Sequence, residues 1–225
     1  MLDTIRAAQA HGIPVPREFQ KPEIVQHLEQ VVCEEWFSGY RAEDLAQRAQ
    51  YRRLAMGPLL YDLADRLSSA AALGRSEDLR LGIYATHDTT LAGIMSTLDA
   101  FDRRWPAFTA SIGVELWRRP SEVTALSTTN TLPSRLARLT SLGSSTLASS
   151  ERSSQPISNS HLYDGHYVRL LYNGRLLLLP ACDKQELCSL KTFLGLVAGL
   201  QKGNETQKLT WEQECALGRG ERSSK

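Results

Sequence analysis

The segment Ala85–Thr89, of sequence ATHDT, lies at the junction of two different hydrophobic periods. Before it, apolar residues alternate with other residues from Leu79 to Ala85, and this period of two predicts a β-strand. After it, apolar residues recur on one helical stripe, at Leu91, Ile94, Met95 and Leu98. The sequence therefore predicts an α/β fold in which residues 87 and 88 lie where a strand ends and a helix begins.

Such a junction is a suitable place for His87 and Asp88 to act on a phosphate ester. The amino terminus of a helix favours anions, because its backbone N–H groups and its dipole present positive charge. In open α/β sheets the ligand crevice lies at the carboxyl ends of strands. The alternative is that Asp88 only caps the helix and that His87 forms a local hydrogen bond, since aspartate is a common N-cap residue.

The rest of the chain supplies further elements of this fold. Residues 1–78 have helical character, and the apolar face over 44–67 contains Pro58, which should kink that helix. Asn173-Gly174 is the preferred two-residue turn of a β-hairpin. The segments predicted as strands after the first one are Ser111–Trp117, Tyr167–Tyr172 and Arg175–Leu179.

Composition divides the chain into parts. Residues 79–117 and 161–200 are predicted to form the α/β core, and 201–225 a polar tail. Residues 118–160 are rich in Ser and Thr and poor in aromatic residues, so they cannot bury enough apolar surface to offset the entropy of ordering. We therefore expect a disordered insertion there. The whole chain has a net charge of +1, which gives no reason to expect a nucleic-acid partner.

Targeting and cysteine patterns add few constraints. The opening residues, Met1-Leu2-Asp3, show neither a basic region nor an apolar one, so no signal peptide is predicted and the compartment stays unknown. No apolar stretch reaches the length of a membrane span. Cys182 and Cys188 are close enough to staple a loop, and the alternative is two free thiols. Their spacing does not match a zinc site and no His lies near in the sequence, so no metal site is expected. No cofactor is expected either, and Cys33 and Cys215 have no assigned role.

Several blocks in order along the chain resemble the histidine acid phosphatases, most closely their lysophosphatidic acid phosphatase-like branch. These blocks are Met56–Leu60, Tyr84–Thr90, Phe101–Phe108, Glu115–Trp117, Tyr167–Gly174, Cys182, Leu187–Leu190 and Phe193. The resemblance implies a phosphoglycerate mutase-like mixed sheet flanked by helices and incomplete at its amino-terminal side. It implies that residues 1–78 are a helical cap remnant and a lead-in helix. It also favours a disulfide between Cys182 and Cys188.

The resemblance implies a phosphomonoester hydrolase that works through a phosphohistidine intermediate on a small phosphomonoester or a lysophospholipid. Carried onto this chain, it makes His87 a phosphate-binding residue and Asp88 the proton donor to the leaving alcohol. A departing alkoxide needs such a donor. No nucleophile is assigned in this chain, because the family's Arg-His-Gly-x-Arg-x-Pro motif is absent.

The nearest string to that motif, Ala10–Pro16, keeps His11 but has Ala and Pro where the family has arginines. We expect His11 to end a helix, with Gly12 just beyond it, rather than to act as a nucleophile. The chain is therefore expected to carry only the carboxyl-terminal, proton-donor half of a phosphatase. The alternative is a catalytically inactive remnant of the fold with at most weak anion binding.

Overall fold

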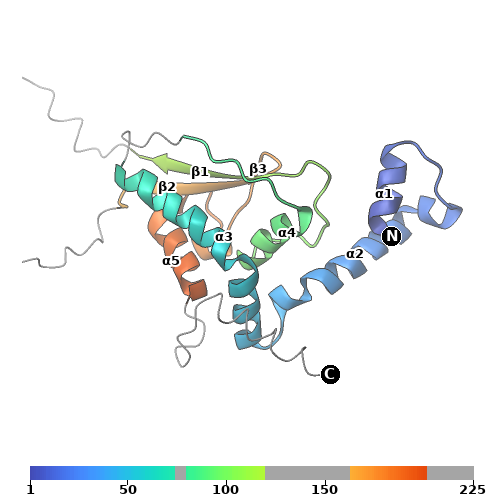
Figure 1. The fold of residues 1–225 in the computed structure, drawn as a ribbon, viewed down its shortest axis with the longest axis horizontal. Helices are drawn as coiled ribbons and strands as arrows, with labels where there is room; N and C mark the ends of the chain where they lie inside the picture. The colour runs from blue at the N-terminus through green and yellow to red at the C-terminus, as the bar shows by residue number, and fades with distance from the viewer. Residues whose placement is uncertain (74–79, 120–162, 202–225) are drawn as a thin grey trace, which may run out of the picture.

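The computed structural model describes residues 1–73, 80–119 and 163–201 of the 225-residue chain (Figure 1). The helices are α1 (Leu2–Ala10), α2 (Pro22–Phe37), α3 (Leu45–Leu73), α4 (Asp88–Thr97) and α5 (Leu190–Gln201). The strands are β1 (Ile112–Arg118), β2 (His166–Tyr172), β3 (Arg175–Leu176) and β4 (Cys188–Ser189). Short 3₁₀ turns cover Arg17–Gln20, Ser38–Arg41 and Pro180–Cys182. This arrangement confirms the predicted α/β class, with a sheet flanked by helices.

The sheet is built around β2. Strand β1 runs antiparallel to it in full register, from Ile112 opposite Tyr172 to Arg118 opposite His166. The short strands β3 and β4 pair with the other edge of β2, also antiparallel. Alternate side chains of β2, such as Val168, point into a core that they share with α3 and α5. Figure 1 shows these two helices side by side along the sheet.

The hairpin between β2 and β3 forms at the predicted turn, although β3 ends at Leu176 and not at the predicted Leu179. Asn173 and Gly174 have positive φ angles of 50° and 75°, as a type I′ turn requires at both central residues. The turn is also tied to the start of β1, because the Ser111 backbone N–H donates to Asn173 Oδ1 at 2.9 Å. The backbone conformation of Asn173 and Gly174 thus sets the register of this hairpin.

Helix α4 is buried on every side, unlike an ordinary surface helix. Ile94 and Leu98 pack into the core with Leu60 of α3, while Ala92 faces a second cluster around Phe37. Gly93 allows the close approach on that second side. A Cβ atom placed there would lie 2.6 Å from the Tyr40 hydroxyl and 3.0 Å from the Met56 side chain.

Helix α3 passes through Pro58 without ending. Proline removes one backbone donor and crowds the preceding turn, which bends a helix. Figure 1 shows α3 bent along its length, which agrees with the predicted kink. The helix extends to Leu73, six residues beyond the predicted apolar face over 44–67.

The strand predicted over Leu79–Ala85 does not form in the part of it that the structure describes. Residues 80–87 belong to no helix or strand, and Leu81 and Ile83 are 72% and 85% exposed. Among the described residues, no backbone hydrogen bond joins 81–86 to another segment. A period of two only places alternate side chains on opposite sides, whereas a strand also needs a neighbouring strand to supply its ladder. Strand β1 is at the edge of the sheet and pairs only with β2 among the described residues, so the segment 80–87 does not extend the sheet along the open edge of β1.

Two predictions fall outside the described residues. These are nearly all of the insertion predicted at 118–160, and the tail at 201–225, of which only Gln201 is described. Within the described ranges, no helix is both long enough and apolar enough to cross a bilayer. Nor do His, Cys, Asp and Glu side chains of those ranges gather into a group that could hold a metal ion.

Candidate active site

His87 and Asp88 lie at the amino terminus of the buried helix α4, at the place predicted from the change of period. Helix α4 begins at Asp88, and His87 is its N-cap residue with extended backbone angles of −104° and 162°. Both residues line a cleft of about 760 Å³ between the extended segment 80–87, β1 and the helical core. The cleft wall is largely apolar and includes Leu59, Leu63, Ile83, Phe108, Leu170 and Phe193.

The backbone of this helix start is already engaged. The Thr89 N–H donates to Asp88 Oδ1 at 2.7 Å, and the Thr90 and Leu91 N–H groups donate to the His87 carbonyl at 3.0 and 3.2 Å. Asp88 is therefore the first helical residue, and its carboxylate accepts a backbone N–H of the first turn. The alternative interpretation, in which Asp88 caps the helix, thus stays open beside the catalytic one. An anion in this place would depend on the exposed His87 side chain and on the helix dipole more than on those N–H groups.

Asp88 has a second partner that sequence reasoning missed. Its Oδ2 accepts a hydrogen bond of 2.7 Å from the indole Nε1–H of Trp105, which lies in the loop between α4 and β1. The Trp105 backbone N–H in turn donates to Oε1 of Glu29 in α2, at 2.8 Å. Trp105 belongs to one of the blocks that carry the family resemblance, but nothing in the sequence pattern links it to Asp88 or to Glu29.

The extended segment next to the site is tethered to α3 by Tyr84. Its hydroxyl donates to Oδ2 of Asp62, which also pairs with Arg66 at 2.9 Å. The hydrogen bonds from Arg66 and Tyr84 lower the pKa of the Asp62 carboxyl below its usual range. The same bond to Asp62 raises the pKa of the Tyr84 phenol. This polar contact joins the segment that leads to His87 to helix α3.

His11 does not take part in this site. Among the described residues it is not one of those that line the cleft. It closes α1 as predicted, because Gly12 has a φ of 65° and the Gly12 and Ile13 N–H groups donate to the Gln9 and Ala8 carbonyls. This is the Schellman pattern of a helix end.

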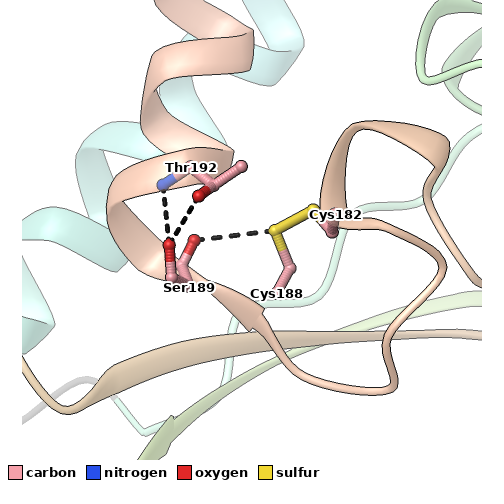
Figure 2. The surroundings of a disulfide bond; sticks show 4 residues. All are labelled: Cys182, Cys188, Ser189 and Thr192. Atoms are coloured by element: carbon pink, nitrogen blue, oxygen red, sulfur yellow. Dashed lines mark hydrogen bonds between the residues drawn. A yellow bond between two sulfur atoms is a disulfide. The ribbon is translucent and has the colours of Figure 1, made fainter.

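Cys182 and Cys188 are joined in a disulfide, with their Cα atoms 5.2 Å apart (Figure 2). It closes the loop between the 3₁₀ turn at Pro180–Cys182 and strand β4. Immediately after it, Ser189 caps the start of α5, since its Oγ accepts the Thr192 N–H at 3.0 Å. Both cysteines of the disulfide belong to the buried core cluster that includes Val168 and Phe193. Cys33 is a buried free cysteine in the second cluster, with Phe37.

Comparison with known proteins identifies relatives of this chain. The model of the histidine phosphatase superfamily (branch 2) matches residues 2–173. A Schizosaccharomyces pombe protein named "Probable acid phosphatase" is 30% identical over 215 residues, which are 89% of this chain and 44% of that protein. Lysophosphatidic acid phosphatase type 6 of Pongo abelii is 31% identical over 52% of this chain and 27% of its own length.

Testicular acid phosphatase of Homo sapiens is 30% identical over 51% of this chain and 26% of its own length. The chain therefore spans less than half the length of these relatives.

Proposed function

This chain belongs to branch 2 of the histidine phosphatase superfamily, and we propose that it carries the proton-donor half of a phosphomonoester hydrolase of the acid phosphatase type. One observation carries the proposal. His87 and Asp88 stand side by side at the start of a buried helix and open on one cleft. A side chain that can carry positive charge, beside a carboxyl group at a helix amino terminus, suits phosphoryl transfer.

In this proposal the two residues have separate roles. His87 holds a phosphoryl oxygen, helped by the positive end of the α4 dipole. Asp88 gives its proton to the leaving oxygen as the phosphorus–oxygen bond breaks. The phosphoryl group passes to a histidine nitrogen of the Arg-His-Gly motif, which this sequence does not contain and a longer form of the protein would supply. Water then releases phosphate from the phosphohistidine.

The cleft and the relatives both support the proposed substrate class. The apolar wall beside His87, with Leu59, Leu63 and Ile83, suits a phosphomonoester that carries an apolar group. One relative is named a lysophosphatidic acid phosphatase. We therefore propose a small phosphomonoester or a lysophospholipid as substrate.

A second candidate is a phosphatase-fold protein without catalytic activity, which binds anions weakly. It is favoured by the missing nucleophile motif, since His87 and Asp88 alone provide a ligand and an acid but no group that attacks phosphorus. The nucleophile and the arginines of that motif usually account for several kcal/mol of the activation barrier to phosphoryl transfer.

An assay on the 225-residue chain tests the binding role of His87, and an assay on a longer form separates the two candidates. The chain as given should show no turnover of an aryl phosphate above the rate of His87→Ala, while inorganic phosphate should shift the His87 imidazole signals in NMR spectra. Steady turnover that is abolished by His87→Ala would contradict this assignment and would return His11 to consideration.

In a longer form that contains the nucleophile motif, Asp88→Asn should slow hydrolysis of alkyl phosphates far more than that of aryl phosphates, whose leaving groups need less protonation. Equal losses on both substrates would mean that Asp88 is structural. No turnover by this longer form would favour the inactive candidate.

A further inference from the structure

Both carboxylate oxygens of Asp88 are held by fixed donors. Oδ1 accepts the backbone N–H of Thr89 in α4, and Oδ2 accepts the indole N–H of Trp105, each at 2.7 Å. The two donors come from different elements, so together they restrict rotation of the carboxyl group about its side-chain bonds. A single donor would restrict that rotation less.

Trp105 is itself held in place by contacts with helix α2. Its ring packs at centroid distances of 5.5 Å from Phe37 and 5.9 Å from Trp36, both in α2. Its backbone N–H donates to Glu29 Oε1, which also lies 2.7 Å from Nη2 of Arg6 in α1. The Glu29 side chain is only 15% exposed, so this contact is largely shielded from water.

We propose that Trp105 and Glu29 are positioning residues for Asp88, and that α1 and α2 set the orientation of the proton donor through them. This inference rests on the proposed role of Asp88, and it adds the contacts that orient the Asp88 carboxyl group. Proton transfer needs the acid within hydrogen-bond reach of the leaving oxygen, and a displacement of about 1 Å costs on the order of a hundredfold in rate. Trp105 contacts Asp88, while Glu29 acts on it only through Trp105.

The test is a pH titration of the indole N–H signals of the chain, followed by ¹H–¹⁵N NMR. The Trp105 signal, assigned by its loss in Trp105→Phe, should move as the Asp88 carboxyl titrates. Asp88→Asn should abolish that movement, because its side chain does not ionise, although its one amide oxygen can accept only one of the two bonds, from Trp105 or from Thr89. Glu29→Gln should keep the pH-dependent movement of the Trp105 signal. This result would show that the movement comes from Asp88 and not from Glu29, the second carboxyl beside Trp105, or from the Glu29–Arg6 ion pair.

The chain contains its own control. Trp117 donates its indole N–H to Glu115 Oε2 at 2.9 Å, on the sheet. Its signal should titrate unchanged in Asp88→Asn and lose its titration in Glu115→Gln. An unchanged Trp117 signal also shows that each variant is folded.

The role of Glu29 is tested by solvent exchange of the Trp105 indole proton. Exchange should be about fivefold faster in Glu29→Ala, the factor that corresponds to the loss of one ordinary hydrogen bond, and normal in Glu29→Gln, whose amide oxygen can still accept. A Trp105 signal that titrates equally in Asp88→Asn would overturn the proposal. Equal exchange in Glu29→Ala and the wild type would remove Glu29 from it. Neither readout uses catalysis. No turnover by a longer form that contains the nucleophile motif, together with the expected spectra, would therefore contradict the proposed function and leave this positioning intact.

Discussion

Strand β1 and the extended segment 80–87 form two sides of the same cleft, and they are held in opposite ways. All seven residues of β1 are paired with β2, and its side chains Val114 and Leu116 pack against the core. The segment 80–87 forms no strand, and its apolar residues Leu81 and Ile83 are largely exposed. Both segments have the same alternating sequence pattern, so the difference arises from the presence or absence of a neighbouring strand.

This difference divides the candidate site. Asp88 begins the buried helix α4 and is held by Thr89 and Trp105, whereas His87 ends the loosely packed segment and has an exposed side chain. The proposed proton donor is thus on the rigid side of the site and the proposed phosphate ligand on the side with few contacts. Segments with few buried apolar contacts open at low free energy. We expect the two sides to respond very differently to substitution.

The largest difference is expected between Phe193→Ala and Ile83→Ala. Phe193 is 1% exposed in the core and Ile83 is 85% exposed in the segment 80–87. The first change should reduce the free energy of unfolding by about 3–5 kcal/mol, through lost burial and a cavity. The second should change it by no more than about 0.5 kcal/mol. Denaturant unfolding measures both, and a large loss from Ile83→Ala would mean that another element covers this segment in solution.

A smaller effect is expected at the glycine that brings α4 close to its neighbours. Gly93→Ala places a methyl group against Tyr40 and Met56 and should reduce the free energy of unfolding by about 1–3 kcal/mol. The matched control is Gly195→Ala in α5, where nothing lies within 4 Å of the added Cβ. That variant should be more stable by about 0.5–1 kcal/mol, because alanine favours the helix. If both variants were equally stable, the packing around α4 would be looser than the structure has it.

The β1–β2 pair should remain intact when the residues between its strands are replaced by a short turn. Arg118 pairs with His166, and the Arg119 N–H donates to the Gly165 carbonyl at 2.8 Å, so the two ends are already adjacent. Replacing 120–162 should leave the fold unchanged and raise the free energy of unfolding by at most about 1–2 kcal/mol, since loop closure depends weakly on length. Loss of the folded state, seen by circular dichroism, would mean that 120–162 pack on the domain.

Features set by neighbouring residues were predictable from the sequence. The end of α1 at Gly12, the Asn173-Gly174 turn and the start of α4 beside His87 each depend on a few adjacent side chains and on backbone angles. Features that depend on distant partners were not. Trp105 is 17 residues from Asp88 and 76 from Glu29, and no periodicity encodes such contacts.

The strand predicted from Leu79 failed for the same reason, since its pattern specifies two faces and cannot supply a neighbour. The catalytic roles of His87 and Asp88 rest on family resemblance and remain a proposal.

The smallest effect is expected where the segment 80–87 is tethered, at the bond from Tyr84 to Asp62. The Asp62 pKa is lowered by Arg66 first and by Tyr84 second. Because the folded pKa lies below the unfolded value, the tether stabilises the segment above the usual titration range of aspartate and is lost as the pH falls through the folded pKa. In Tyr84→Phe the Asp62 pKa should therefore rise toward its ordinary value, as measured by ¹³C NMR of the carboxyl group.

Two comparisons make this test specific. Arg66→Gln should raise the Asp62 pKa further than Tyr84→Phe does, because the bond from Arg66 is the larger cause of the shift. Neither change should alter the midpoint of global unfolding measurably, since Asp62 and Tyr84 are on the surface and the core around Phe193 does not involve them. An unchanged Asp62 pKa in Tyr84→Phe would mean that the tether is not formed in solution. The segment that ends at His87 would then be held even less firmly than β1 across the cleft, and the contrast between the two sides of the site would be greater.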